Sequence, residues 1–195
     1  MSTAYLLKQS VSLAVALGER DAYTAIHSGR VEALSAELGA RCGLSSAEIF
    51  TLRTAAKLHD VGKIGIPDRI LLKQSSFEPA EWKIMQTHSI IGQRICEMIN
   101  HKDAKQVAHL VRHHHENFDG SGYPDQLAGE DIPISSRIIA IVDSYDAMST
   151  VRPYHQPRSH MQVMEIINSE VGRKIDPYIL SHFEVIITHN SHRAD

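Results

Sequence analysis

The sequence predicts an all-α protein in which about seven helices pack as a bundle. Apolar residues recur every three to four positions along most of the 195 residues, which is the period of an amphipathic helix. No segment alternates apolar and polar residues as a half-buried strand does, and no internal repeat is visible. The length and the 43% hydrophobic content are typical of one domain with a sizeable core, so we expect residues 1–195 to form a single domain.

Glycines end the first two predicted helices. The first covers residues 3–17 and stops at Gly18, and the second covers about 20–39 and stops before Gly43. His27 lies near the apolar stripe of the second helix, so one interpretation of it is a partly buried structural histidine.

A capping box begins the third predicted helix, over about residues 46–60. In this motif the side chains of Ser45 and Glu48 each accept a hydrogen bond from the other residue's backbone N–H. His59-Asp60 lies at the C-terminal end of the helix, and we expect Gly62 to end it. A histidine and a carboxylate at a helix end can converge with ligands from other elements.

The middle of the chain is predicted to hold a connection and two further helices. Residues 61–78 are expected to form a surface connection with a short turn. Pro79 suits the first position of a helix over 79–99, kinked near His88. A helix over about 103–114 follows and ends in His113-His114-His115. Adjacent helical residues point in different directions, so at most two of these three should face one centre.

Glycine and proline mark residues 117–133 as an ordered loop, although an ordinary irregular connection is the alternative. Tyr123 is the one aromatic residue of its Gly122-Tyr123-Pro124 segment. Ser135 or Ser136 is expected to cap the apolar helix that follows. Asp143 comes directly after Ile-Ala-Ile-Val in that helix, and a carboxylate there is costly unless a cation meets it.

The last two predicted helices cover about 160–172 and 177–190 and have ordinary amphipathic patterns. Asp176-Pro177 provides a cap and a first turn for the second of them. The histidines here are expected to be surface or structural residues: His182, His189 and His192.

Composition excludes several classes of partner. The formal net charge of -3 predicts no general attraction to DNA or anionic membranes. No apolar run is long enough to cross a bilayer, and the first residues do not have the pattern of a secretory signal. Cys42 and Cys96 form no CxxC motif, so we expect two reduced thiols in a cytoplasmic protein.

Histidine is unusually frequent, with 13 residues against 4 Phe and 1 Trp. Divalent metals such as Fe, Mn or Zn accept imidazole and carboxylate ligands together. The candidate ligands exceed the number that one catalytic zinc needs and fit two metals that share a bridging carboxylate. They are His27, His59, Asp60, His88, His114, His115 and Asp143.

At these positions the sequence closely resembles the HD-GYP family of bacterial cyclic di-GMP phosphodiesterases, from about Arg20 to Phe183. The matching residues are Arg20-Asp21-Ala22-Tyr23-Thr24, His27-Ser28, Arg30-Val31, Leu58-His59-Asp60-Val61-Gly62-Lys63, His114-His115-Glu116, Asp119-Gly120-Ser121-Gly122-Tyr123-Pro124, Ile132-Pro133, Asp143, Asp146-Ala147-Met148 and Arg152-Pro153-Tyr154. The ordered set is far more specific than His-Asp alone.

The resemblance implies an HD-superfamily bundle with a binuclear metal centre in its core. One metal would take His27, His59, Asp60 and Asp143, and the other would take Asp60, His88, His114 and His115, with Asp60 bridging. The resemblance excludes His113. The implied substrate contacts are Lys63, Tyr123, Asp146, Arg152 and His155. From the residues alone, Asp146 could equally hold a backbone group or an arginine. Fe or Mn is expected, with Ni, Zn and Mg as alternatives.

Two departures from the family pattern bear on this reading. Some members carry a Glu one turn before the first histidine and bind a third metal, but Tyr23 occupies that position here, so we expect two metals. His155 replaces a Lys or Arg that is frequent in the family, which predicts a weaker and pH-dependent phosphate contact.

The implied activity is hydrolysis of cyclic di-GMP to pGpG and onward to GMP, with Asp60 and Lys63 as catalytic residues. The alternatives are a cyclic di-GMP receptor, a module that docks a GGDEF-type protein through Gly122-Tyr123-Pro124, and an HD-type phosphohydrolase acting on other nucleotides. The sequence leaves the oligomeric state open, a homodimer included.

Overall fold

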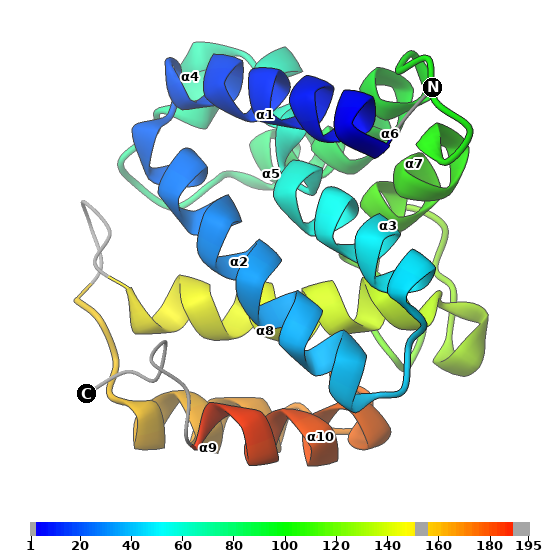
Figure 1. Ribbon diagram of the computed structural model, residues 1–195. Coiled ribbons are helices and arrows are strands. Elements are labelled where there is room, and N and C mark those ends of the chain that lie inside the picture. The colour runs from blue at the N-terminus through cyan, green and yellow to red at the C-terminus, as the bar shows by residue number, and fades with distance from the viewer. Residues whose placement is uncertain (1–2, 151–155, 189–195) are drawn as a thin grey trace.

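The computed structural model describes residues 3–150 and 156–188, which form a bundle of helices without a named strand (Figure 1). The all-α prediction is confirmed. Ten α-helices and two short 3-10 helices, η1 and η2, occur within these residues. They are α1 (Thr3–Gly18), α2 (Ala22–Arg41), α3 (Ser46–Leu58), η1 (Val61–Gly65), α4 (Asp68–Leu71), α5 (Pro79–Gln86), α6 (His88–Glu97), α7 (Ala104–Arg112), η2 (Gly129–Asp131), α8 (Ile134–Ser149), α9 (His160–Ser169) and α10 (Pro177–Ile187).

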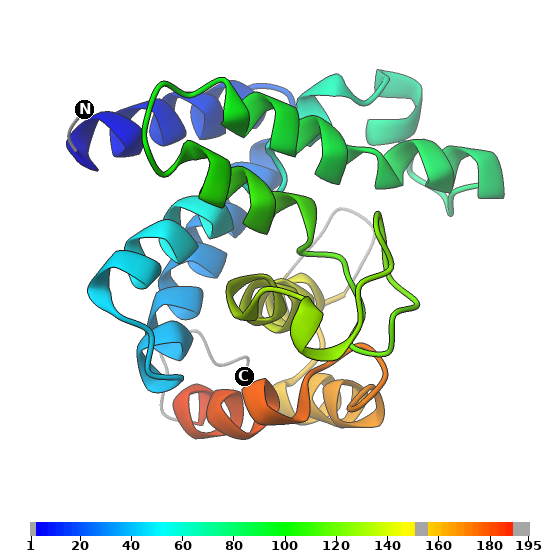
Figure 2. The same cartoon turned by 90° about the vertical axis from the view of Figure 1, so that its right-hand side faces the viewer.

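Helix α8 lies at the centre of the bundle. Figure 2 shows it nearly end-on, with α2 and α3 on one side, α6 and α7 above it, and α9 and α10 below. Five of its apolar residues are at most 1% exposed: Ile138, Ile139, Ile141, Val142 and Tyr145. A helix that is apolar on several faces must be covered on several faces. The central position of α8 carries Asp143 and Asp146 into the interior.

Two of the three predicted caps are confirmed, and one is wrong. Ser45 and Glu48 form the capping box of α3, and Asp176 caps α10. Pro133, not a serine, precedes α8, and no side chain caps that helix. Ser136 instead donates a hydrogen bond to the carbonyl oxygen of Leu110 (3.0 Å), which ties α8 to α7.

The predicted kink near His88 is a break between two helices. α5 ends at Gln86, and α6 begins at His88. Thr87 lies between them, and its hydroxyl donates to the carbonyl oxygen of Ile84 (2.6 Å). The backbone N–H of Thr87 donates to the same oxygen (3.0 Å), so this residue closes the last turn of α5.

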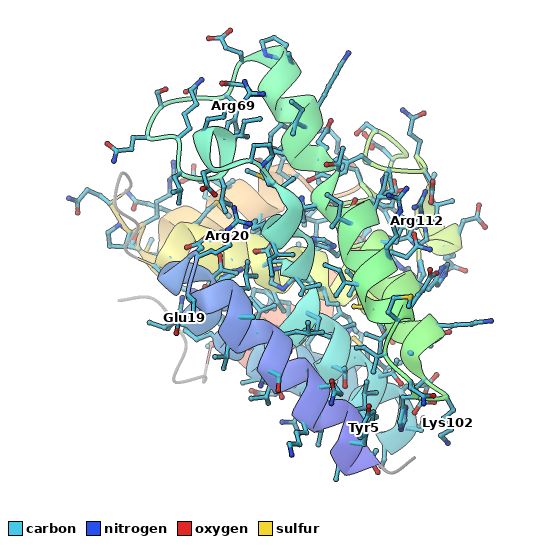
Figure 3. The ribbon with its side chains drawn as sticks, turned by 90° about the horizontal axis from the view of Figure 1, so that it is seen from above. Tyr5, Glu19, Arg20, Arg69, Lys102 and Arg112 are labelled. Atoms are coloured by element: carbon cyan, nitrogen blue, oxygen red, sulfur yellow. The ribbon has the colours of Figure 1, made fainter. Side chains whose placement is uncertain are left out.

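The expectation of a surface connection over residues 61–78 is wrong for its first part. Val61, Ile66 and Ile70 are at most 1% exposed, because η1 packs against α6. Arg20, labelled in Figure 3, fixes this segment: its guanidinium donates to the carbonyl oxygens of Ile64 and Ile66 (the latter at 3.1 Å) and pairs with Asp68.

Gly62 does not end α3, which already ends at Leu58 with His59 as its C-cap. A Cβ atom on Gly62 would lie 1.8 Å from the carbonyl oxygen of His88 and 2.5 Å from the amide nitrogen of Gly92. Both atoms are backbone, so neither can swing aside. Glycine is needed here because η1 and α6 approach each other too closely for any side chain.

Two further observations complete the fold. Among the described residues no helix combines the length and the apolar character that a bilayer crossing requires. Cys42 and Cys96 are free thiols, as expected.

A comparison of two glycine substitutions tests the close contact. We expect Gly62→Ala to lower the free energy of unfolding by at least about 1–3 kcal/mol, because the backbone around it cannot yield. Gly29→Ala, in α2 with open space around it, is the control and should be neutral or stabilising by up to about 1 kcal/mol. Denaturant unfolding measures both, and equal effects would contradict the packing described.

Candidate metal centre

Three histidines follow the last turn of a helix, where a carbonyl oxygen holds each ring. In every case Nδ1 bonds a carbonyl three residues earlier. The pairs are His59 with Ala56 (2.7 Å), His88 with Met85 (2.8 Å) and His114 with Val111 (2.6 Å). A carbonyl only accepts, so Nδ1 carries the proton and Nε2 keeps a lone pair. The helix ends thus select the tautomer that binds metals through Nε2.

His27 and Asp143 reach the same point from α2 and α8. Nε2 of His27 lies 3.0 Å from Oδ1 of Asp143, and the same oxygen lies 3.8 Å from Nε2 of His59. The ring centroids of His27 and His59 are 5.3 Å apart. His27 is therefore not an isolated structural histidine: residues of α2, of α8 and from the end of α3 meet in one cluster.

Asp60 lies between two groups of candidate ligands. One group is His27, His59 and Asp60, and the other is His88, His114 and His115; within each, the donor atoms are within 4.8 Å of one another. Oδ2 of Asp60 is 3.4 Å from Nε2 of His59, and Oδ1 is 3.6 Å from Nε2 of His88. Each oxygen of this carboxylate thus faces a different group, which is the geometry of a bridging ligand.

The cluster has the donors that a cation would satisfy. Nε2 of His59 is buried and makes no hydrogen bond with any described residue. Nε2 of His88 and Nε2 of His114 lie 3.4 Å apart although their Nδ1 atoms hold the protons. Two facing lone pairs repel unless a positive charge lies between them, so these residues fit divalent metals.

Burial determines the protonation of the second group. It disfavours the charged imidazolium, lowers the pKa values of His88 and His114, and lowers that of His115 to about 3. These rings are neutral at physiological pH, which is the form that binds metals.

The carboxylates determine the charge of the first group. Burial opposes a charged His27, but its hydrogen bonds with Asp143 and Asp146 outweigh that and raise its pKa to about 10. Burial also disfavours a charged Asp60, yet the Lys63 ammonium and the charged His27 ring hold its pKa well below the usual range. Asp60 is therefore ionised and available as a ligand.

Lys63 and Tyr123 border the cluster, as the sequence predicts. Nζ of Lys63 lies 2.7 Å from Oδ2 of Asp60. The ring of Tyr123 packs on His115 with centroids 4.9 Å apart, and burial raises the pKa of its hydroxyl, which stays a neutral donor. Both side chains face the same cavity as Asp60.

Asp146 holds an arginine, one of the partners that the sequence allows, and its substrate contact stays a prediction. Its carboxylate is buried, accepts two hydrogen bonds from Arg30 (2.6 and 2.8 Å), and lies 2.7 Å from Nδ1 of His27. It therefore orients His27 in the way that backbone carbonyls orient the rings of His59, His88 and His114. The sequence analysis missed the role of Arg30, although its spacing from His27 places both on one face of α2.

Several expectations lie outside what the structure describes. Arg152 and His155 fall in the undescribed segment 151–155, and the side chain of Tyr23 is not described either. His189 and His192 also lie beyond the described residues, whereas His182 is partly exposed, with Nδ1 2.9 Å from the carbonyl oxygen of Tyr178.

His113 belongs to a separate cluster, in agreement with its exclusion. Its Nε2 lies 2.8 Å from Asp125, whose carboxylate also accepts two hydrogen bonds from Arg112 (2.6 Å each), labelled in Figure 3. Glu116 accepts from the backbone amide of Asp125 (2.7 Å). These contacts attach the loop containing Tyr123 to the end of α7.

Two cavities of about 370 and 340 Å³ adjoin the cluster. The larger is lined by Asp60, Lys63 and His88, and the smaller by His114, Asn117 and Lys174. They share the side chains of Trp82, His115, Tyr123 and Asp143. The site is therefore a two-lobed cavity, with candidate metal ligands in the wall of each lobe.

Comparisons with known proteins agree with this architecture. A family model described as HD domain matches residues 5–179. A cyclic di-GMP phosphodiesterase of Thermotoga maritima is 42% identical over 84% of this chain and 45% of its own length. The 3′3′-cGAMP-specific phosphodiesterase 2 of Vibrio cholerae is 37% identical over 91% of this chain and 34% of its own length. This chain thus spans about a third to a half of these curated relatives.

A solved structure shares the fold. A Bdellovibrio bacteriovorus protein described as HDG"Y"P superposes with a TM-score of 0.67 at 21% identity, over 83% of this chain and 51% of that one. Because the family match covers most of the chain, the chain belongs to the HD domain family, in agreement with its resemblance to the HD-GYP proteins.

Proposed function

We propose that this chain is a metal-dependent phosphodiesterase that hydrolyses cyclic di-GMP to pGpG and then to GMP. The observation that supports this most is the convergence of five imidazoles and two carboxylates, divided in two groups by Asp60, beside a two-lobed cavity. The relatives named above act on cyclic dinucleotides according to their names.

Two divalent cations, Fe or Mn, fit the two groups of ligands. When bound, they would supply an activated water near neutral pH and neutralise charge on the phosphate. His27, His59, Asp60 and Asp143 would hold one, and Asp60, His88, His114 and His115 the other.

The protein's own side chains would orient the phosphodiester. Lys63 places its ammonium beside Asp60 and within the larger cavity, where it can meet a non-bridging phosphate oxygen. Such a charge is most effective in a site with little water, because protein dipoles and charges replace a solvent shell that would have to reorganise. The Tyr123 hydroxyl offers a neutral donor in the same cavity.

The rival proposal is a receptor that binds a cyclic dinucleotide, or a GGDEF-type protein through the Gly122-Tyr123-Pro124 loop, without cleaving anything. A receptor has no need of seven converging ligands, so the geometry favours catalysis. We keep a homodimer and a cytoplasmic location as further proposals; the two free thiols suit a reducing compartment.

Removal of the bridging carboxylate tests the proposed function. We expect metal-loaded wild-type protein to convert cyclic di-GMP to pGpG. We expect Asp60→Asn to lose both turnover and one or both metals, because an amide is neutral and offers only one oxygen. Chromatography of the products and elemental analysis of the metals measure the two quantities. Full turnover by the variant would contradict the role of Asp60, and stoichiometric binding by wild type without product would support the receptor.

Replacement of Asp146 tests its indirect role. We expect Asp146→Asn to weaken metal binding about 10- to 100-fold, because a ligand's orienting partner affects affinity to that extent. The asparagine keeps the volume and one acceptor, so folding should persist. Calorimetric metal titration measures the effect, and Asp131→Asn, at an exposed residue of η2, is the control. Equal affinities in the two variants would show that Asp146 only stabilises the bundle.

A further inference from the structure

We propose that Trp82 and Gln86 form a base-binding subsite: one purine of the substrate stacks on the indole of Trp82, and the Gln86 amide bonds the edge of that base. The proposal rests on the proposed function, because it concerns the same two-lobed cavity. Neither residue is a candidate metal ligand, and both lie on α5.

Trp82 stands where the two lobes meet. Its side chain lines both cavities, and the residue is 45% exposed. Large aromatic side chains are seldom left so open unless they contact a partner, because they lose much apolar burial. An indole at the junction of two cavities offers a flat surface to whatever spans them.

Neighbouring rings hold the indole in place. Phe77 stacks on Trp82 with centroids 6.1 Å apart and an interplanar angle of 24°. Tyr123 meets Trp82 edge-on, with centroids 6.2 Å apart and an angle of 83°. A platform whose orientation is fixed before binding loses little side-chain entropy when a base stacks on it. Stacking on such a ring changes affinity about 5- to 150-fold per base.

Gln86 lies one helical turn after Trp82, on the same face of α5, and lines the smaller cavity with it. Its side chain makes no hydrogen bond with any described residue. An amide offers one acceptor oxygen and two N–H donors. It can therefore accept from N1–H and donate to O6 of guanine, or, after a 180° turn, accept from the N6 amino group and donate to N1 of adenine. This predicts that the subsite accepts either purine.

Fluorescence tests the stacking directly, because Trp82 is the one tryptophan of the chain. We expect GMP and AMP to quench the emission of metal-loaded wild-type protein, and ribose 5-phosphate, which has no base, to leave it unchanged. In turnover of cyclic di-GMP, Trp82→Leu should raise KM about 5- to 150-fold and lower kcat less, while Trp82→Phe should stay close to wild type. Unchanged emission at saturating GMP, or an unchanged KM in Trp82→Leu, would overturn the subsite.

A second variant tests the edge contact. Glutamate offers acceptors only, so Gln86→Glu should bind N1–H and the N2 amino group of guanine and repel N1 of adenine. We expect the ratio of GMP to AMP affinity to rise at least about tenfold relative to wild type. The ratio cancels the general effect of an added negative charge on nucleotide binding. An unchanged ratio would remove Gln86 from the subsite.

The outcomes separate this inference from the proposed function. If wild-type protein does not cleave cyclic di-GMP but GMP quenches Trp82, the subsite stands and the phosphodiesterase proposal falls. If cyclic di-GMP is cleaved while neither the emission nor the KM of Trp82→Leu responds, the subsite falls and the phosphodiesterase proposal stands.

Discussion

Backbone carbonyl oxygens at helix ends hold three of the five imidazoles of the centre in one tautomer, and the rest of the site depends on this. The ends of α3, α5 and α7 meet in the bundle, and each places one Nε2 lone pair at the meeting point. The carbonyls are available because the last turn of any helix leaves them without partners. The helical packing that forms the core thus also forms the donor set.

The opposite side of the site uses carboxylates in place of carbonyls. His27 lies in the middle of α2, where the helix's own hydrogen bonds occupy the carbonyls. Asp146 takes over the task, and Arg30 balances its charge at 2.6 and 2.8 Å. A buried carboxylate without such a partner would be costly. Arg30 therefore reduces the cost of burying Asp146 beside His27, a candidate metal ligand.

The sequence predicts the helical class, most element positions and the residues that converge, because hydrophobic periodicity and the His-Asp motifs are local patterns. It does not predict features that depend on contacts between distant segments. Gly62 is required by the backbone of α6, Ser136 bonds α7 instead of capping α8, and Trp82 has the periodicity of a core residue although it lines a cavity. Arg152 and His155 lie outside the described residues, so their expected contacts stay predictions.

The break at Thr87 has a consequence for the cavity. It makes α5 a separate short helix. Trp82 and Gln86 therefore do not lie on α6, the helix that begins with His88. Substitutions in α5 can change the shape of the cavity, provided that the backbone carbonyl of Met85 stays in place to orient the ring of His88. Substitutions at Trp82 and Gln86 can therefore change the lining of the cavity while the histidines and aspartates of the candidate metal centre stay in place.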